Sequence, residues 1–590
     1  MSSSATTTQK IKYAGMGVFL IGIVSFILTL FVGEYVLTER ITTTYIPKDA
    51  HSFFTDIHGK MFTSKHSFIQ QLNKSFDDYN LEIVKSYSIS DEEKNTLLQK
   101  VDDAGIFQSS HISETILGGS QESRFKREKL TAYTSWIIGR NDELGTIKSL
   151  LETKINELNT SIVYEKGMDK AKVKSTVFAV VKSSTTGLFF AYKSLFFILS
   201  FVFTVFGALI YIFPFRLEGL PGIKNNRVFQ SSVTNGGTIG LSVMAFLIGF
   251  YVCLYWYPEY ITEWVILVDP LSMALSGNPA SQWFLYGFMY TVSMAVMGVR
   301  MMIKYRHNKY QLVRTLSILF FQSCFAFILP EILVRLNQPY FDFKNMWPLD
   351  YDFFDAWHID MLTSNGGIGL FMFVWGITLF AVGVPVLTYF FGKRWYCSWV
   401  CGCGGLAETV GDPYRQLSDK SLNAWKLERI SIHSVLVFSI IMTFGVLYTY
   451  ITQQYELFGL STQDIRQTYG FLIGSAFSGV VGTGFYPKFG SRVWCRFGCP
   501  LAAYLGLIQR FKSRFRITTN GTQCISCGNC STYCEMGIDV RWYAQRGQDI
   551  VRSSCVGCGV CAAVCPRGVL KLENGTVELD VDYLEKESIS

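Results

Sequence analysis

The sequence predicts a mainly α-helical membrane protein with about eight transmembrane helices, an outer helical domain and a C-terminal α+β, two-[4Fe–4S] ferredoxin-like domain. Two observations lead to this fold class. Of the 590 residues, 49% are hydrophobic and only 17% are charged, whereas soluble domains carry about 25% charged residues. Near the C-terminus, two cysteine runs repeat the spacing C-x2-C-x2-C-x3-C, which is the spacing that holds paired [4Fe–4S] clusters.

Apolar runs along the chain predict the membrane spans, because each is long enough to cross a hydrocarbon core of about 30 Å. They lie near Tyr13–Val36, Leu188–Phe213, Gly237–Tyr257, Gln282–Met302, Leu312–Leu333, Gly367–Phe391, His433–Tyr450 and Tyr469–Tyr486. The last run is the weakest candidate because it is rich in Gly, Ser and Thr. Lys10 and Lys12 precede the first run, which is long and lacks a clean cleavage site, so we expect an uncleaved anchor rather than a signal peptide.

Charges in the loops predict the orientation of these spans. The loops after the second, fourth and sixth spans are rich in Lys and Arg, whereas the loop 258–281 carries Glu259, Glu263 and Asp269 without a basic residue. Basic loops stay on the cytoplasmic side of a membrane. The sequence therefore predicts a multi-pass protein of the cytoplasmic (inner) membrane. Both termini and the cluster domain are expected in the cytoplasm, as an even number of spans requires.

The remaining segments set the domain boundaries. The stretch 37–187 is hydrophilic, and Ser90-Asp-Glu-Glu93 within it has the pattern of a capping box at a helix N-terminus. We expect this stretch to form a mostly helical domain outside the cytoplasm. The expected segments are 1–36 (N-terminal tail and first span), 37–187 (outer domain), 188–490 (membrane domain with about seven spans and the first C-x3-C motif), 491–515 (second C-x3-C motif and a connecting helix), 516–575 (ferredoxin-like domain) and 576–590 (C-terminal tail).

The two ferredoxin-type runs supply eight candidate ligands. In a two-cluster ferredoxin, three cysteines of each run bind one cluster and the fourth binds the other. This rule gives Cys524, Cys527, Cys530 and Cys565 to cluster 1 and Cys534, Cys555, Cys558 and Cys561 to cluster 2. Pairs spaced C-x2-C also bind zinc, but eight cysteines in this doubled spacing favour clusters. Glu535 stands where the first run would usually carry proline, which changes the turn after Cys534 and leaves the ligand set intact.

Two further cysteine motifs precede the ferredoxin runs. Cys397 and Cys401 follow the sixth span, and Cys495 and Cys499 follow the eighth, each pair after an arginine and an aromatic residue. If the segments are helical, a spacing of four residues puts both sulfurs on one helix face. Four facing thiolates could hold a third cluster or one tetrahedral metal ion, with Cys403 as a substitute ligand. Free thiols, a redox-active dithiol and structural zinc are the alternatives.

Other cofactors and partners find little support in the sequence. Only His433 lies at the edge of a span, so paired histidine ligands for haem b are missing, and no C-x-x-C-H motif for a c-type haem occurs. Neither a Rossmann nor a P-loop fingerprint is present. We expect no haem and no nucleic-acid partner. Without an evident substrate pocket, the chain fits a component of an electron-transfer oxidoreductase, which leaves open whether it is itself an enzyme.

Over residues 366–571 the chain resembles the NosR/NapH-type membrane iron–sulfur proteins, or polyferredoxins. The resemblance rests on two C-x3-C motifs at span ends, the double ferredoxin run, and the fragments Cys495-Arg-Phe-Gly-Cys499-Pro500 and Cys534-Glu-Met-Gly-Ile-Asp539. It implies electron transfer between a quinol pool or cytoplasmic donor and a redox partner outside the cytoplasm. The first motif departs from the family pattern at Cys401-Gly-Cys403, and the outer domain lacks the Ser/Thr-Gly-Ala-Thr flavin site, so no covalent flavin is expected.

The predicted function is therefore an integral-membrane electron-transfer protein that passes single electrons through two [4Fe–4S] clusters, with a candidate third metal centre at the membrane edge. Its expected partners are redox proteins or the quinol pool. One alternative is a membrane redox sensor, although no kinase, cyclase or DNA-binding output follows the clusters. Another is a metal-reducing assembly factor, although the outer loops carry only scattered His and Met.

Overall fold

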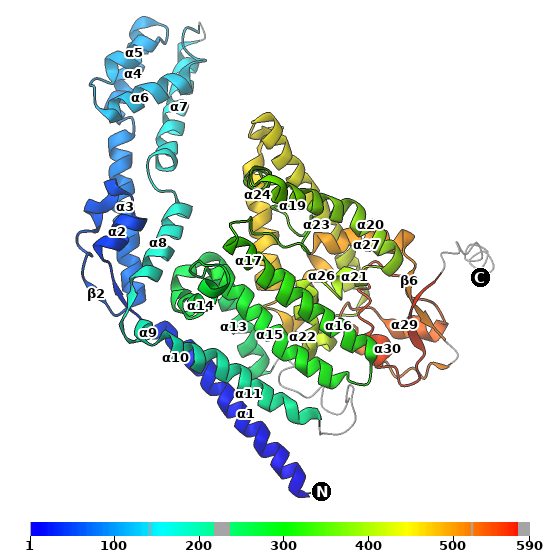
Figure 1. The fold of residues 1–590 in the computed structure, drawn as a ribbon. Helices are drawn as coiled ribbons and strands as arrows, with labels where there is room; N and C mark the ends of the chain where they lie inside the picture. The colour runs from blue at the N-terminus through cyan, green and yellow to red at the C-terminus, as the bar shows by residue number, and fades with distance from the viewer. Residues whose placement is uncertain (1, 141–142, 217–236, 521–522, 576–590) are drawn as a thin grey trace, which may run out of the picture. The chain divides into compact units, whose positions relative to one another are not determined.

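The computed structural model describes residues 2–140, 143–216, 237–520 and 523–575, and the predicted tail 576–590 lies outside them. The chain divides into two compact units. The membrane unit comprises Met1–Phe26, Ser194–Tyr257 and Trp264–Ser590, and the helical unit comprises Ile27–Lys193 and Pro258–Glu263. Figure 1 colours both units along the chain.

Seven helical stretches among the described residues are long and apolar enough to cross a membrane, which supports an integral membrane protein. They are Thr7–Phe31, Lys193–Arg216, Thr238–Trp256, Gln282–Lys304, Lys309–Arg335, Gly366–Phe391 and Leu422–Thr452. Their helices are α1 (Ser2–Leu28), α10 (Lys193–Phe197), α11 (Phe203–Ile212), α13 (Thr238–Trp256), α15 (Gln282–Lys304), α16 (Lys309–Phe320), α17 (Leu329–Arg335), α19 (Gly366–Thr378), α20 (Val384–Phe391) and α23 (Leu422–Thr452). Shorter helices are α14 (Thr262–Leu275), α18 (Ala356–Ser364), α21 (Arg394–Cys397), α22 (Gly402–Thr409), α25 (Tyr486–Phe489), α26 (Val493–Phe497) and α27 (Pro500–Lys512).

The described chain thus has seven candidate spans where the sequence predicted about eight. The predicted eighth span instead consists of α24 (Thr462–Tyr469) and a π-helical segment, η9 (Gly470–Val481). It is less apolar than the other seven because α24 contains Asp464 and Arg466 and because Gly and Ser dilute the apolar residues of η9. Between α23 and α24, strands β4 (Glu456–Leu457) and β5 (Leu460–Ser461) form a short antiparallel pair.

The helical unit contains α2 (Glu39–Tyr45), α3 (Lys65–Tyr87), α4 (Asp91–Ala104), α5 (Ser109–Thr115), α6 (Gln121–Thr134), α7 (Leu144–Glu165), α8 (Lys170–Ser184) and α9 (Gly187–Ala191). The capping box is confirmed, because the Ser90 hydroxyl accepts a bond from the Glu93 N–H and the Glu93 carboxylate accepts one from the Ser90 N–H. Strands β1 (Glu34–Val36), β2 (Met61–Phe62) and β3 (Thr185–Thr186) form an antiparallel sheet in the order β2-β1-β3. Strands this short have no readable alternation, so the sequence did not predict them.

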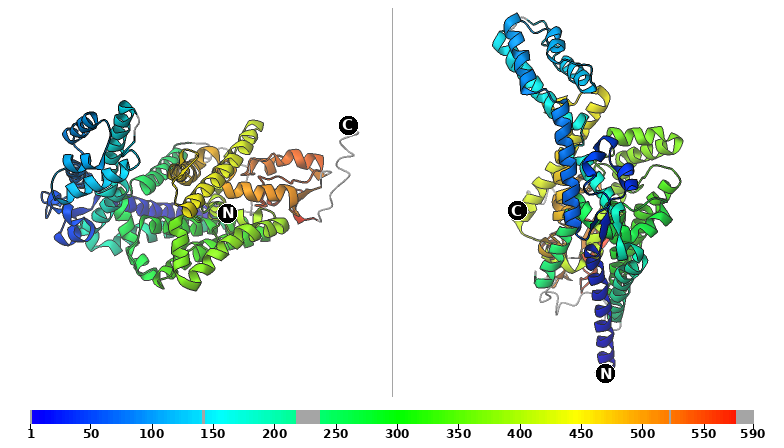
Figure 2. Two further views of the ribbon diagram at one scale, coloured as in Figure 1. Left: turned by 90° about the horizontal axis from the view of Figure 1, so that it is seen from above. Right: turned by 90° about the vertical axis from the view of Figure 1, so that its left-hand side faces the viewer.

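Two apolar cores hold the helical unit together. One surrounds α3, where Phe68, Leu72 and Phe76 are fully buried. The other joins α4 to α7 through buried residues that include Leu97 and Leu151. In Figure 2 the light-blue helices α4 to α6 gather beside the cyan helix α7. Where a mostly helical domain was expected, the structure therefore has a helical unit that also contains the small sheet of β1, β2 and β3.

An acidic loop before α18 in the membrane unit gives a pH-dependent prediction. Burial raises the pKa of Asp350 to about 7, helped by the charges of Asp352, Asp342 and Asp355 and opposed by Lys344. An unfolded aspartate has a pKa of about 3.9, so the folded protein binds more protons between about pH 4 and pH 7. The free energy of unfolding should therefore decrease as pH rises through this window.

The variant Asp350→Asn isolates that contribution. Its thermal unfolding in detergent should be less sensitive to pH than that of the unmodified protein between about pH 4 and pH 7. Equal pH dependence in both proteins would contradict the role given to Asp350.

The last described segment has α+β composition. Strands β6 (Phe515–Thr519) and β7 (Leu570–Asn574) pair antiparallel, with Phe515 opposite Asn574 and Thr519 opposite Leu570. Helices α28 (Asn529–Thr532), α29 (Val540–Arg546) and α30 (Val560–Ala563) lie between the two strands in the sequence. We call residues 515–575 the ferredoxin module. It shares one apolar core with the C-x3-C motifs, and in Figure 1 its orange and red elements lie beside α16, α21 and α27.

Candidate iron–sulfur sites

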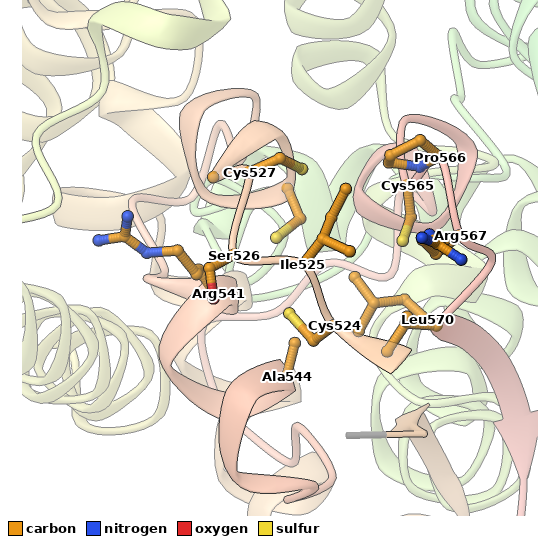
Figure 3. Close-up of a pocket in the computed structure, with 13 residues that line it drawn as sticks. Cys524, Ile525, Ser526, Cys527, Arg541, Ala544, Cys565, Pro566, Arg567 and Leu570 are labelled. Atoms are coloured by element: carbon orange, nitrogen blue, oxygen red, sulfur yellow. The ribbon is translucent and has the colours of Figure 1, made fainter. Parts of the chain in front are cut away.

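The cysteines predicted for cluster 1 line one cavity of the ferredoxin module, cavity 1. Figure 3 shows the cavity with Cys524, Cys527 and Cys565 labelled around it, and Cys530 completes the lining. Cys527 is exposed, whereas Cys530 is buried. All residues that line cavity 1 belong to the ferredoxin module. Because Cys527 and Ile525 are exposed, cavity 1 lies at the surface of the membrane unit.

The cysteines predicted for cluster 2 line a second cavity, cavity 2, which contains Cys534, Cys555, Cys558 and Cys561. Backbone hydrogen bonds reach two of these thiols. Met536 and Ile538 bond to Cys534, and Gly557 bonds to Cys555. N–H groups directed at sulfur stabilise thiolates and tune iron–sulfur potentials, so the donor set of cavity 2 fits a cluster.

Two glycines give the cysteine loops matching conformations. Gly528 follows Cys527 with φ +78°, and Gly559 follows Cys558 with φ +73°. Each precedes a one-turn helix, α28 or α30. A side chain would be strained in this left-handed region, so the local repeat of the two runs extends to the backbone.

The C-x3-C motifs do not form continuous helices, so the condition under which one helix face would carry both sulfurs is not met. Cys397 ends α21, and Cys401 then caps the N-terminus of α22. Likewise Cys495 lies in α26, and Cys499 caps the N-terminus of α27. The helix is interrupted within each motif, because the N–H of the second cysteine donates to the carbonyl five residues back instead of four. Cys401 donates to Tyr396, and Cys499 donates to Trp494.

The second cysteine of each C-x3-C motif lies at a helix N-terminus, where backbone N–H groups favour a thiolate. The Ala502 N–H bonds to Cys499 Sγ at 3.3 Å. The thiol of Cys403 bonds to Cys401 and lowers the pKa of Cys401, helped by the Gly404 backbone and opposed by burial. Cys403 therefore serves in this structure as a hydrogen-bond donor to Cys401.

The four C-x3-C cysteines share one buried site, the membrane-edge site. Cys397, Cys401, Cys495 and Cys499 are 6–7% exposed and belong to the same apolar core. The site also contains an arginine directed at sulfur, because Arg492 Nη1 lies 3.7 Å from Cys495 Sγ. The guanidinium group also donates to the Cys397 carbonyl at 3.3 Å, which joins the two motifs.

A buried ammonium group lies next to this site. Lys393 is 1% exposed, and its Nζ donates to the carbonyls of Ala502 and Ser553, both at 3.0 Å. Among the described residues no carboxylate lies within ion-pair distance of this Nζ. Burial raises the pKa of Cys397 to about 12, and Lys393 is the first opposing charge. A buried cation without a carboxylate fits an anionic group held by the nearby thiols.

The spacing of the thiols bears on which metal they suit. In zinc sites the Zn–S bond is about 2.3 Å, so tetrahedral sulfurs lie about 3.8 Å apart. Within the described ranges, the residues that bring three potential ligand atoms within 4.8 Å of one another are Glu408, Glu535 and Cys558. In each of the three cysteine sets the sulfurs are spaced more widely than these ligand atoms. The wider spacing suits a cubane with thiolates at four separate iron corners.

The trio of Glu408, Glu535 and Cys558 does not suit a metal ion, because arginines already occupy both carboxylates. Glu408 forms ion pairs with Arg314, Arg415 and Arg492, the last at 2.8 Å. Glu535 accepts from Arg415 at 2.8 Å and from Arg492 at 2.9 Å. We call these five residues the arginine–glutamate network.

The network lies between the membrane-edge site and cavity 2. Its members are all nearly inaccessible to solvent. Although burial disfavours a carboxylate, the three guanidinium groups hold the pKa of Glu408 well below its usual range. Arg492 contacts Cys495, and Glu535 follows Cys534 in the chain. Glu535 therefore does more than alter a turn, since it ties the ferredoxin module to the C-x3-C motifs.

Residues near the membrane-edge site also hold the loop that carries the cluster 2 cysteines. The side chains of four polar residues bond to consecutive carbonyls of this loop. The bonds are Gln509 to Cys555 (2.8 Å), Ser398 to Val556 (2.7 Å), Tyr310 to Gly557 (2.8 Å) and Gln311 to Cys558 (2.8 Å). These bonds attach the loop that lines cavity 2 to α16 and to the segments that bear the C-x3-C motifs.

Comparisons with known proteins agree with the cofactor prediction. A family model described as a 4Fe-4S binding domain matches residues 372–421 and again residues 469–518, and a 4Fe-4S dicluster domain model matches residues 523–570. The repeated match covers both C-x3-C motifs. The prediction of [4Fe–4S] clusters as cofactors is therefore confirmed, and the finer resemblance to NosR/NapH-type proteins stays a prediction.

One curated relative is similar over part of its length. The chain is 26% identical over 158 residues to YccM of Escherichia coli (strain K12), a protein named for a role in electron transport. The aligned stretch covers 25% of this chain and 43% of that protein. No solved structure matches the chain.

Proposed function

We propose that this chain is an integral-membrane electron-transfer protein with three [4Fe–4S] centres in a row. Cys397, Cys401, Cys495 and Cys499 hold the first centre at the membrane edge. Cavity 2 holds the second and cavity 1 the third, with the ligand sets expected from the ferredoxin spacing. The bound clusters supply one-electron transfer, and the surrounding residues hold them, exclude water and adjust their potentials.

The four bonds from Gln509, Ser398, Tyr310 and Gln311 to the Cys555–Cys558 loop carry this proposal. They fix cavity 2 against α16 and the segments that bear the C-x3-C motifs, and the arginine–glutamate network adds a second attachment. Cavity 1 contains the exposed Cys527, whereas the cysteines of cavity 2 are all buried or half-buried. This order of contacts supports a path from the membrane edge, through cavity 2, to the exposed cavity 1.

We further infer that α24 and η9 make an eighth membrane crossing. The two C-x3-C motifs adjoin each other, yet α23 lies between them in the chain and its 31 residues extend about 46 Å at 1.5 Å per residue. A return crossing after α23 reconciles the two facts. Helix α23 packs against α24, and η9 packs against α13, so neighbouring helices can shelter the less apolar segment. Eight crossings leave both termini on the same side of the membrane, which the basic loops predict to be the cytoplasmic side.

Replacing Cys558 with serine tests the middle of the path. We expect about four irons per chain to be lost and electron exchange between the other two centres to stop, while membrane insertion continues. Iron analysis and electron paramagnetic resonance of the reduced protein measure the two effects.

Cys324→Ser is the matched control, since Cys324 lies in the π-helical turn Phe321–Ile328 of a candidate span and belongs to no proposed ligand set. It should keep full iron content. A Cys558→Ser protein with full iron and unchanged electron exchange would contradict the ligand assignment.

A further inference from the structure

The rim of cavity 1 carries positive charge on both sides of its cysteine loop. Figure 3 shows Arg541 and Arg567 flanking the loop that bears Ser526 and Cys527. Both arginines line the cavity, and none of the other lining residues is acidic. Both are exposed, and among the described residues neither forms an ion pair.

The same rim is apolar between the two arginines. Ile525 is 54% exposed at the mouth of the cavity, next to the exposed Cys527. Trp542, beside Arg541 in α29, is 43% exposed. An exposed apolar centre with charges at its edge is the usual composition of a protein-docking surface.

We propose that this rim is the docking surface for a soluble, acidic one-electron carrier of the ferredoxin type. The inference rests on the proposed function, because cavity 1 is the exposed end of the cluster path. Arg541 and Arg567 attract the acidic face of the carrier, and Ile525 packs against it. Each encounter transfers one electron, which one protein loses and the other gains, and no atom is exchanged.

The charge complementarity favours an acidic protein over a neutral or basic partner. Opposite charges steer two proteins toward each other and raise the association rate, and added salt screens this attraction. The two arginines would raise the association rate, since their exposed side chains can contact the carboxylates of an approaching partner. A role confined to the potential of cluster 1 would instead act without a partner present.

The test is binding of a gallium-substituted plant-type ferredoxin, an acidic probe that cannot transfer electrons. Arg541→Glu and Arg567→Glu should each weaken binding about tenfold at low ionic strength. The difference from the unmodified protein should shrink as salt is added. Lys571→Glu is the control, because it makes the same change in net charge at an exposed position outside the cavity lining, and its binding should change little.

Iron content and reduction by dithionite separate this inference from the proposed function. All three variants should keep full iron and the same dithionite-reduced spectrum. Unchanged probe binding in the two arginine variants would overturn the docking surface, as would an equal loss in Lys571→Glu. A shifted cluster potential without any loss of binding would also overturn it. Missing iron in the unmodified protein would count instead against the proposed function.

Discussion

Replacing Cys499 with serine is expected to remove one entire cluster, about four irons per chain, and to leave the two clusters of the ferredoxin module in place. Serine lacks the soft thiolate that iron–sulfur clusters need. Cys499 caps α27 and accepts the Ala502 N–H, so its sulfur is already oriented for a ligand. The reduced protein should lose one paramagnetic signal and its magnetic coupling to the neighbouring centre. Iron analysis and electron paramagnetic resonance measure both losses.

Cys403→Ser is the informative companion to this variant. Cys403 bonds to Cys401 rather than completing the four-cysteine set, and serine can also donate a hydrogen bond. Its iron content should therefore match that of the unmodified protein. Loss of four irons from Cys403→Ser, with none lost from Cys499→Ser, would show that the ligand set of the membrane-edge site is different.

Replacing Glu408 with alanine should lower the free energy of unfolding by about 3–5 kcal/mol, the usual cost of removing one partner from a buried ion pair. Arg314 would then lose its carboxylate partner at a site nearly inaccessible to solvent, while Arg415 would keep Asp412 and Glu535 and Arg492 would keep Glu535. Because the network attaches the ferredoxin module to the C-x3-C motifs, we expect the module to loosen first. Chemical unfolding in detergent gives the free energy, and the protection of amides around Cys558 from hydrogen exchange reports the loosening.

Glu157→Ala provides the matched control for that experiment. Glu157 forms an exposed ion pair with Lys154 in α7, and such surface pairs contribute at most about 1 kcal/mol. The double variant Glu408→Gln with Arg314→Gln should recover part of the loss, because it removes one charge of each sign. If Glu408→Ala were as stable as Glu157→Ala, the network would not have the structural role given to it here.

The cysteine ligands could be predicted from the sequence because their chemistry is local. The spacing within residues 524–534 and 555–565 brings each set to one cavity, and the glycines Gly528 and Gly559 add matching turns. Long apolar runs likewise predicted most of the spans. In contrast, the break between Cys397 and Cys401 depends on a backbone bond to Tyr396, and the four-residue spacing alone is equally compatible with a helix.

The arginine–glutamate network could not be predicted in the same way. Arg314, Glu408, Arg492 and Glu535 come from four distant segments, and ion pairs between such segments leave no periodic pattern in a sequence. Glu535 was conspicuous as a missing proline, yet only its neighbours in the fold reveal that it accepts bonds from two arginines. The buried Lys393 was one basic residue among several after the sixth span, and its burial distinguishes it only in the structure.

Iron and acid-labile sulfide per chain, measured on protein purified without oxygen in detergent, test the central claim of three centres most directly. We expect about twelve irons and about twelve sulfides, because each [4Fe–4S] cluster holds four of each. About eight of each would contradict it, since the membrane-edge cysteines would then hold no cluster and the path would end at cavity 2.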